Sequence, residues 1–478
     1  MREGAPKIIG IIKALSEHPG QMIPLFSSRN YNTFLSVLRE SGLRVAISNM
    51  MRVMDNSASD IERISVLKGI EVQEFTGQVL HVPYSDNPLV SVVIPVYNQF
   101  EYTYWCVKSI VETTKDLDYE IIIADDCSTD TTRDIEKYLP GVRVIRNEKN
   151  LRFTLNCNNA VKYAKGKYVA LLNNDTVVMD GWMSALVEVL ERDPKVGSVG
   201  SKMNYPDGVL QEAGCVVWRD GSAWNIGKGL NPNLPQFNYL KEVDYVSGAS
   251  FMFPKAVWDE LMGFDERYAP SYCEDSDLAF QMRYNGYKVM YQPRSCVVHF
   301  EGMSNGKALG SSLKSYQLVN TRKFYEKWRD VLMDHSTMGA DLFIARDRSA
   351  DKRCVVYVDE HITDPNGDEF DRFASEEMIS CARNGDSVKL IADDYFLDEK
   401  SASVFQDEGI EVLYGGEARR DQKKWAHDYK KFIDLVVVCR PYLMRKYKRL
   451  FRGTEVRLIG YDEASIPEKK RSYQSLQH

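Results

Sequence analysis

The stretch YVALLNNDT, residues 168–176, is an apolar run that ends in two carboxamides and a carboxylate. Its five leading apolar residues are typical of a strand that is covered on both faces in a parallel sheet. The polar end places Asn173, Asn174 and Asp175 at the tip of that strand. In open parallel α/β sheets, ligands bind beyond the carboxyl ends of the strands. The stretch therefore predicts a buried strand together with a polar group at a ligand-binding edge.

The surrounding sequence alternates between short apolar stretches and stretches of helical period. The expected strands are LVSVVIPVYN (89–98), YEIIIADDCS (119–128), VRVIRNE (142–148) and YVALLNND (168–175). The expected helices are EYTYWCVKSIVETT (101–114), DTTRDIEKYL (130–139) and LNCNNAVKYAK (155–165). This order predicts parallel βαβ units. Residues 196–300 combine strands, glycine-rich loops and one helix, so we expect a mixed rather than a simply wound sheet there.

A second alternating set begins near residue 352. Its expected elements are RCVVYVDE (353–360), a helix in DEFDRFASEEMISCARNG (368–385), SVKLIADD (387–394), IEVLYGG (410–416), FIDLVVVCRP (432–441) and TEVRLIGYDE (454–463). A helical stretch, SYQLVNTRKFYEKWRDVL (315–332), lies between the two sets. The length of 478 residues and these two sets favour about three units.

The first 85 residues have a helical period, as in Ile8, Ile11, Ile12 and Leu15. We favour packing of these residues on the following domain, and the alternative is an amphipathic region that touches an anionic membrane surface. Lys13 interrupts the apolar patch before a secretory core is reached. We therefore expect a cytoplasmic chain.

The composition is that of a soluble globular protein. The chain has 44% hydrophobic and 27% charged residues and a formal charge of -7, which does not indicate a nucleic-acid partner. The longest apolar runs are shorter than the roughly 18 residues that a membrane span needs. Nine cysteines without a CxxC pair are typical of free thiols in a reducing compartment.

Three strand ends carry polar clusters: PVYN (95–98), ADDCSTD (124–130) and NND (173–175). Polar residues at a strand end can simply cap the next helix, as Ser128 or Asp130 would for residues 131–139. Grouped at one sheet edge, they can instead hold a divalent cation or accept hydrogen bonds from a base or ribose. Their shared position favours the second interpretation.

Two later motifs have the same ambiguity. APSYCEDSDLAF (269–280) places Glu274, Asp275 and Asp277 in a first helical turn, where the helix dipole favours acids and where one acid could be a general base. SCVVHFEGMSNG (295–306) brings His299 to the end of a strand, either as a metal ligand or as a hydrogen-bonded core residue.

The order of these motifs resembles the inverting family-two glycosyltransferases of GT-A fold, particularly bacterial members that build rhamnose-containing O-antigens. The resemblance covers about residues 89–330. Its motifs are VSVVIPVYN (90–98), IIIADDCSTD (121–130), GKYVALLNNDT (166–176), VSGASFMFPKAVWDELMGFDERY (246–268), CEDSDLAFQMRYNGYKV (273–289) and VVHFEGMSNG (297–306). It implies an α/β fold in which a mixed, mainly parallel sheet binds a nucleotide sugar. The implied domains are a helical region at 1–85, a GT-A domain at 86–345 and a Rossmann-like domain at 350–465.

The resemblance also implies a role for each matched residue. The donor would be bound by Pro95, Val96, Tyr97, Asn98, Asp125, Asp126, Arg152, Asn173 and Asn174. Asp175 and His299 would hold Mn2+ or Mg2+, Asp275 would be the catalytic base with Glu274 beside it, and Gly248 and Ala249 would line the acceptor side. The chain departs from the family pattern in having Asn173 for an acid and Arg152 and Ala160 for glycines.

The implied function is a metal-dependent inverting glycosyltransferase that moves a sugar from dTDP-rhamnose or a UDP-sugar to a growing bacterial surface glycan. The alternative is a catalytically silent nucleotide-sugar-binding subunit. A nucleotidyltransferase is disfavoured, because no glycine-rich, lysine-bearing phosphate loop follows the first strand. The acceptor would be a glycan or a lipid-linked glycan at the inner face of the membrane, with peripheral membrane contact and a homo-oligomer or a glycosyltransferase partner left open.

The last unit resembles, more loosely, the amino-terminal half of a GT-B glycosyltransferase. The donor nucleotide of that fold sits mainly in the second half, for which the remaining residues leave no room. We therefore expect this unit to be catalytically silent, or the chain to be a fragment of a two-enzyme protein.

Overall fold

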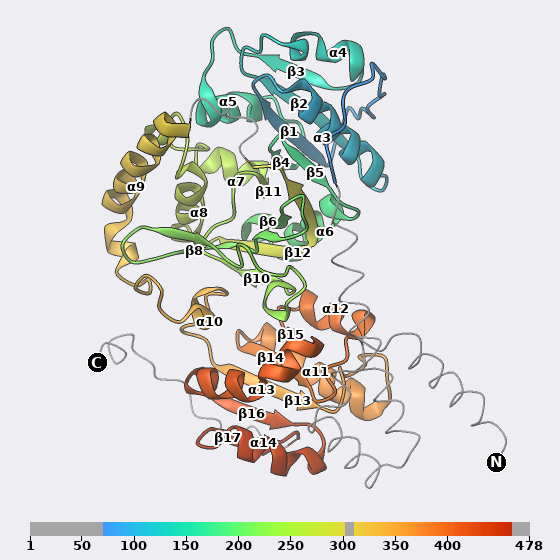
Figure 1. Cartoon of the computed structure of the whole chain (residues 1–478), viewed down its shortest axis with the longest axis vertical. Helices are drawn as coiled ribbons and strands as arrows, with labels where there is room; N and C mark the ends of the chain where they lie inside the picture. Colours follow the sequence, from blue (N-terminus) through green and yellow to red (C-terminus); the bar gives the residue numbers. More distant parts are fainter. Residues whose placement is uncertain (1–69, 302–309, 461–478) are drawn as a thin grey trace, which may run out of the picture.

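Two β-sheets, one above the other in Figure 1, form the body of the protein. The computed structural model describes residues 70–301 and 310–460, and side chains of the second range from residue 316 onward. Helices α9 (Gly310–Leu332) and α10 (Leu342–Ala345) lead from the first sheet to the second. Across those two ranges, no helix is long and apolar enough to cross a bilayer.

The first half of the upper sheet is parallel. Strands β4 (Tyr168–Leu172), β1 (Val90–Val96), β2 (Tyr119–Asp125) and β3 (Arg143–Arg146) lie side by side in that order. Helices α3 (Phe100–Thr113), α4 (Ile135–Tyr138) and α5 (Arg152–Val161) connect them. The central strands are buried along their whole length except at Pro95, because helices and loops cover both faces. The predicted βαβ units are therefore present.

The second half of the same sheet is mixed. Strand β11 (Ser250–Pro254) runs antiparallel between β4 and β6 (Val196–Asn204), and β12 (Lys288–His299) is parallel to β6. Short strands β5 (Thr176–Val178), β7 (Leu210–Glu212) and β10 (Lys241–Glu242) pair at its margin, and β8 (Cys215–Val217) forms a hairpin with β9 (Ala223–Asn225). Helices α6 (Trp182–Arg192), α7 (Lys255–Glu260) and α8 (Glu274–Tyr284) complete this half. The expected α/β fold class with a mixed, mainly parallel sheet is confirmed.

The lower sheet is entirely parallel, in the order β15 (Glu411–Leu413), β14 (Ser387–Ala392), β13 (Cys354–Asp359), β16 (Leu435–Val438) and β17 (Glu455–Leu458). Its helices are α11 (Glu369–Arg383), α12 (Glu399–Asp407), α13 (Gly415–Tyr429) and α14 (Met444–Leu450). The apolar stretches of the sequence predict all five strands. The domain limits 86–345 and 350–465 remain predictions.

Two expectations differ from the structure. The helical stretches predicted for residues 1–69 lie outside the described residues, but residues 70–85, also predicted to be helical, form no helix. They run extended instead, because Leu80 and Val82 donate backbone hydrogen bonds to Tyr138 and Pro140 and the Phe75 ring packs on Tyr104. Residues 196–300 contain two helices, α7 and α8, rather than one.

The two sheets are tied together by specific contacts. The Leu240 amide donates to the Gln406 carbonyl at 2.9 Å, the Tyr239 hydroxyl to the Asp347 carboxylate at 2.8 Å, and the Tyr414 hydroxyl to Asn233 at 3.1 Å. The contacts connect the segment around β10 with α12, β15 and the chain after α10, so the lower sheet is docked against the upper one.

Candidate active site

A cavity of about 890 Å3 opens at the edge where β1, β2 and β4 end. The β8–β9 hairpin, the first turns of α5 and α8 and one face of α9 complete its wall. Of the predicted site residues, the lining includes Pro95, Val96, Tyr97, Asn98, Asp126, Arg152, Asn173, Asn174, Gly248, Ala249, Glu274, Asp275 and His299. Asp125 and Asp175 are not among the lining residues. The structure thus brings together residues that are far apart in the sequence, from Pro95 to His299.

Asn98 connects the segments that follow β1 and β2 by hydrogen bonds. Its side-chain oxygen accepts from the Thr129 backbone amide at 2.7 Å, and its backbone amide donates to the Ser128 hydroxyl at 2.8 Å. Asn98 has a φ of 58°, a left-handed conformation that asparagine tolerates better than most residues. The predicted helix cap is also present, because Asp130 accepts from the Thr132 amide.

The two acids at the end of β2, Asp125 and Asp126, lie in different surroundings and make different contacts. Asp126 faces the cavity and accepts from the amides of Leu151 and Arg152, both at 2.7 Å. Asp125 is buried, and its carboxylate accepts from the Ser128 amide and pairs with Arg146 at 3.2 Å. Asp125 therefore shapes the loop from behind.

The Arg152 backbone shows why glycine would suit this position. Its φ is 65°, in the left-handed region that disfavours residues with a Cβ atom. The hydrogen bond from its amide to Asp126 holds this conformation. Arginine at this position thus keeps the expected turn and adds a cationic side chain to the cavity wall.

The three polar residues at the end of β4 make different contacts. The Asn173 backbone amide donates to the Ala249 carbonyl at 2.9 Å, which joins the strand tip to the loop that leads into β11. The Asn174 side chain donates to the Thr103 hydroxyl at 3.0 Å. Asp175 is buried, and its Oδ1 lies 3.2 Å from His299 Nε2. This contact follows from the antiparallel pairing of β5 with β12, in which Thr176 lies opposite His299.

His299 is oriented by a residue that the sequence did not indicate. Its Nδ1 lies 3.1 Å from Gln211 Oε1, so with this amide assignment Nδ1 carries the proton and donates. Nε2 is then the ring nitrogen that faces the Asp175 carboxylate. Histidines that bind metal ions typically donate their other ring nitrogen to an oxygen in this way.

The Asp175–His299 pair supplies two metal-binding side chains. Within residues 70–301 and 310–460, no group of three or more His, Cys, Asp or Glu side chains is placed to hold a metal ion. An ion at this pair would need its remaining ligands from diphosphate oxygens and water, as Mg2+ commonly does. The pair fits an ion that is held jointly by protein and nucleotide.

The acids at the start of α8 separate into two groups. Asp275 Oδ2 accepts from the Gly248 amide at 3.0 Å, and both Glu274 and Asp275 line the cavity. Burial raises the pKa of Asp275, and burial together with the nearby Asp275 charge raises that of Glu274. Asp277 instead points to α9, where it accepts from Trp328 Nε1 at 2.7 Å and Lys327 Nζ at 2.8 Å.

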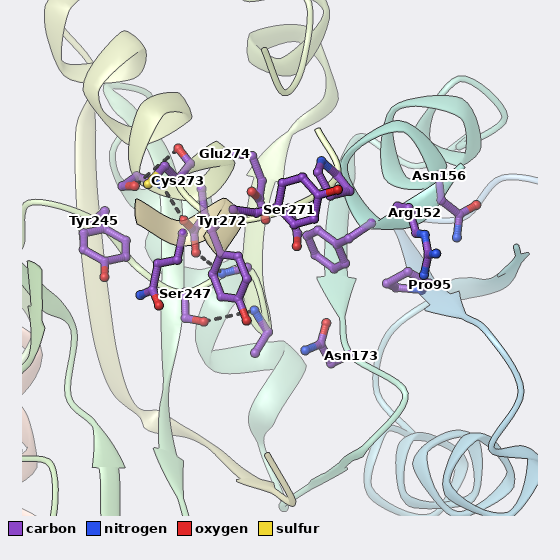
Figure 2. Close-up of a pocket in the computed structure, with 18 of the residues that line it drawn as sticks. Pro95, Arg152, Asn156, Asn173, Tyr245, Ser247, Ser271, Tyr272, Cys273 and Glu274 are labelled. Atoms are coloured by element: carbon purple, nitrogen blue, oxygen red, sulfur yellow. Dashed lines mark hydrogen bonds between the residues drawn. The ribbon is translucent and has the colours of Figure 1, made fainter. Parts of the chain in front are cut away.

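Helix α9 holds the loop before these acids. Tyr272 and Cys273 both have left-handed backbones, with φ values of 76° and 71°. The Asn320 side-chain amide reaches the carbonyls of Tyr268, Ser271 and Tyr272, at 2.7, 2.9 and 3.2 Å. Figure 2 shows Ser271, Tyr272 and Cys273 beside Glu274 at the middle of the cavity. The loop that precedes Glu274 and Asp275 is therefore held by α9, a helix that comes later in the chain than β12.

Glu212 is a buried carboxyl group beneath the cavity wall. It accepts from the Ser247 amide at 3.1 Å and from the Asn225 side chain at 2.9 Å. Burial raises its pKa to about 7. Sequence reasoning missed it, although a glutamate between Leu210 and the apolar stretch that starts at Ala213 is a signal worth noting.

Comparison with known proteins identifies the part of the chain that holds most of this site. Residues 91–259 match the family model described as glycosyl transferase family 2. This stretch is similar to glycosyl transferase family 2 domains. The matched residues supply the β1, β2 and β4 tips and Gly248, while Glu274, Asp275 and His299 follow them.

The chain also has relatives among curated bacterial proteins. The chain is 26% identical over 292 residues to the O-antigen biosynthesis protein RfbC of Myxococcus xanthus, which covers 59% of this chain and 22% of that protein. It is 25% identical over 220 residues to the N-acetylglucosaminyl-diphospho-decaprenol L-rhamnosyltransferase of Mycobacterium tuberculosis, covering 41% of this chain and 71% of that protein. A structure of GalNAc-T7 with UDP, GalNAc and Mn2+ is similar with a TM-score of 0.41 and 19% identity, covering 52% of this chain and 50% of that one. The chain spans about a quarter of the length of the first curated relatives that it matches.

Proposed function

We propose that this chain transfers a sugar from a nucleotide diphosphate donor to a hydroxyl group of a growing bacterial surface glycan. The observation that carries the proposal is the position of Asp275, which lies in the cavity wall next to Gly248 and shares the cavity with the strand tips and His299. The family 2 domain and the relatives in surface glycan synthesis support it.

The donor would lie against the strand tips. Residues 95–98 and Asp126 offer backbone and carboxylate groups to the base and ribose, and Asn173 and Asn174 offer neutral polar groups beside them. Arg152 would attract the diphosphate with its positive charge. Asp125 would act indirectly, through the Ser128 amide that it holds.

Asp275 would be the base that removes the proton of the acceptor hydroxyl. A base must be ionised to act, and its strength rises with its pKa, which burial raises here. The hydrogen bond from Gly248 fixes the carboxylate toward the loop at residues 247–249. Attack from this side with departure of the diphosphate on the other is a single displacement, which inverts the anomeric carbon.

Asp175 and His299 would hold Mn2+ or Mg2+ at the diphosphate. When bound there, such an ion offsets the negative charge that develops on the leaving group. One carboxylate and one imidazole form a sparse ligand set, so we expect weak metal binding without the nucleotide. Gln211 would keep His299 in the ligating tautomer.

The experiment that tests the proposal compares wild-type protein with Asp275→Asn. Both are incubated with Mn2+ and a panel of UDP-glucose, UDP-N-acetylglucosamine, GDP-mannose and dTDP-rhamnose, and the nucleoside diphosphate released by transfer of the sugar to water is measured. Loss of the base should lower the rate about 100-fold or more while donor binding is kept. Glu266→Gln is the control, because Glu266 is an exposed acid that does not line the cavity.

Equal rates for wild type and Asp275→Asn would remove Asp275 as the base. If the wild type binds a donor but releases no nucleoside diphosphate, the result would favour the alternative of a catalytically silent nucleotide-sugar-binding subunit.

A further inference from the structure

The cavity has two ends that differ in chemistry. Figure 2 shows Pro95, Arg152 and Asn156 at one end and Tyr245 and Ser247 at the other, with Glu274 and Tyr272 between them. If the donor occupies the strand-tip end, as the proposed function holds, the other end is where an acceptor must lie. We call it the acceptor end. Asn225 shares it with Ser247, because both bond the Glu212 carboxylate, and Thr321 reaches it through the contact of its hydroxyl with Cys273 Sγ at 3.9 Å. Ala223 and Gln317 are the cavity-lining neighbours of Asn225 on β9 and of Thr321 on α9, so the lining of this end is Ala223, Asn225, Tyr245, Ser247, Gln317 and Thr321.

The side chains of the acceptor end are polar and aromatic. Asn225, Gln317, Ser247 and Thr321 offer amide and hydroxyl groups, which can both donate and accept hydrogen bonds. Tyr245 adds a ring that can pack on the C–H face of a sugar. None of these six residues is charged, whereas Arg152 lies at the opposite end.

Two carboxyl groups, Glu212 and Asp275, lie beneath and beside this end. Glu212 is buried and holds the two lining groups Asn225 and Ser247 by hydrogen bonds of 2.9 and 3.1 Å. Asp275 faces the cavity next to Gly248, and its charge is one of those that raise the pKa of Glu212. An anionic group brought next to Asp275 would therefore be repelled, and in a desolvated site that repulsion is strong.

We propose that the acceptor end binds an uncharged sugar ring, so that the reaction extends a neutral residue of a glycan rather than a uronic acid. The amides and hydroxyls suit sugar hydroxyls, and the carboxyl groups disfavour a ring that carries its own carboxylate. The proposal rests on the proposed function for the choice of which end takes the acceptor.

The test uses two probes that differ only at C6 of the sugar: p-nitrophenyl β-D-glucoside and p-nitrophenyl β-D-glucuronide. Saturation-transfer NMR is recorded with each on the full chain in the presence of UDP and Mn2+ at pH 8. We expect signal from the ring protons of the glucoside and binding of the glucuronide weaker by about tenfold or more. The proposal would be overturned if the glucuronide bound as tightly as the glucoside or more tightly, or if the ring protons of the glucoside showed no saturation-transfer signal.

Variants of α9 locate the binding. Gln317→Ala should weaken glucoside binding, and Gln317→Lys should narrow the difference between the two probes by placing a cation at the acceptor end. Leu318→Ala is the matched control, since the next residue on the helix is 76% exposed and does not line the cavity. Loss of glucoside binding in the Leu318 variant as well, or no effect of either Gln317 variant, would place the sugar elsewhere.

Donor turnover separates this proposal from the proposed function. Release of nucleoside diphosphate from a donor together with preference for the glucuronide would support the proposed function and contradict the neutral acceptor. Binding of the glucoside at Gln317 without any consumption of a donor would support the sugar site and contradict the transferase function.

Discussion

Glu212 is a buried carboxyl group that changes charge near neutral pH. Its pKa of about 7 in the folded chain exceeds the value of 4.5 that a free glutamate has, because burial penalises the charged form. Between these two values the unfolded chain has lost this proton and the folded chain has kept it. The free energy of unfolding therefore falls as pH rises through this window, by about 3 kcal/mol in total.

Replacement of this group should remove that pH dependence. We expect Glu212→Gln to lose less thermal stability than wild type between pH 5 and pH 8, since an amide does not ionise and can still accept from the Ser247 amide. The measurement is the melting temperature of both proteins across that range. Glu266→Gln, an exposed change, should follow the wild type. Parallel curves for Glu212→Gln and wild type would show that Glu212 is not the titrating group.

At the residue scale, the sequence indicated the acids and the histidine that line the cavity but not the residues that hold them in place. Glu274, Asp275 and His299 stand in motifs with a recognisable order, so their place in one cavity could be expected. Glu212 and Gln211 stand on a strand of only three residues, and their partners lie in other elements. Such pairings depend on how the chain turns after β6, which no local pattern shows.

At the scale of the elements, helix α9 holds the loop that precedes Glu274 and Asp275. Left-handed backbone at Tyr272 and Cys273 costs about 1 kcal/mol or more at each residue and persists only where neighbours hold it. The Asn320 amide meets three carbonyls of this loop, and the Asn320 side chain is buried. Asn320 is therefore a positioning residue for the turn that presents Glu274 and Asp275.

Asn320→Ala should relax this turn. We expect kcat to fall about tenfold or more with little change in the KM for the donor, because misplacement of a base slows the chemical step without removing donor contacts. Trp328→Phe is the matched control, since it deletes a 2.7 Å hydrogen bond to Asp277 from the same helix and leaves the loop contacts intact. If both variants lose stability and kcat equally, Asn320 is only structural.

The strands of the lower sheet and of the parallel half of the upper sheet could be predicted from their apolar runs, whereas most strands of the mixed half and their order could not. β11 has the same apolar character as its neighbours but runs antiparallel between β4 and β6. Strand direction depends on the path of the preceding chain, here the long excursion through the β8–β9 hairpin. Ala223, Asn225, Tyr245 and Ser247 of the acceptor end come from that excursion, and the sequence indicated only Gly248 and Ala249 on that side.

At the scale of the whole molecule, a buried group of charges joins the two sheets. Glu411 accepts from Arg346 at 2.6 Å and from Lys389 at 2.7 Å, and Lys389 lies 3.7 Å from Asp347. Tyr239, from the upper sheet, donates to Asp347. All five side chains are buried, so each charge depends on its partners for stabilisation.

Lys389→Met should weaken the junction between the sheets. It leaves Glu411 with one cationic partner and Asp347 without its nearest lysine, and breaking a buried ion pair costs about 3–5 kcal/mol. We expect a lower melting temperature by calorimetry and faster tryptic cleavage between α9 and β13. Lys424→Met, which removes an exposed pair with Asp428, should leave both unchanged, because surface pairs contribute about 1 kcal/mol or less. A Lys389 variant as stable and as resistant as the Lys424 variant would mean that apolar packing alone holds the two sheets together.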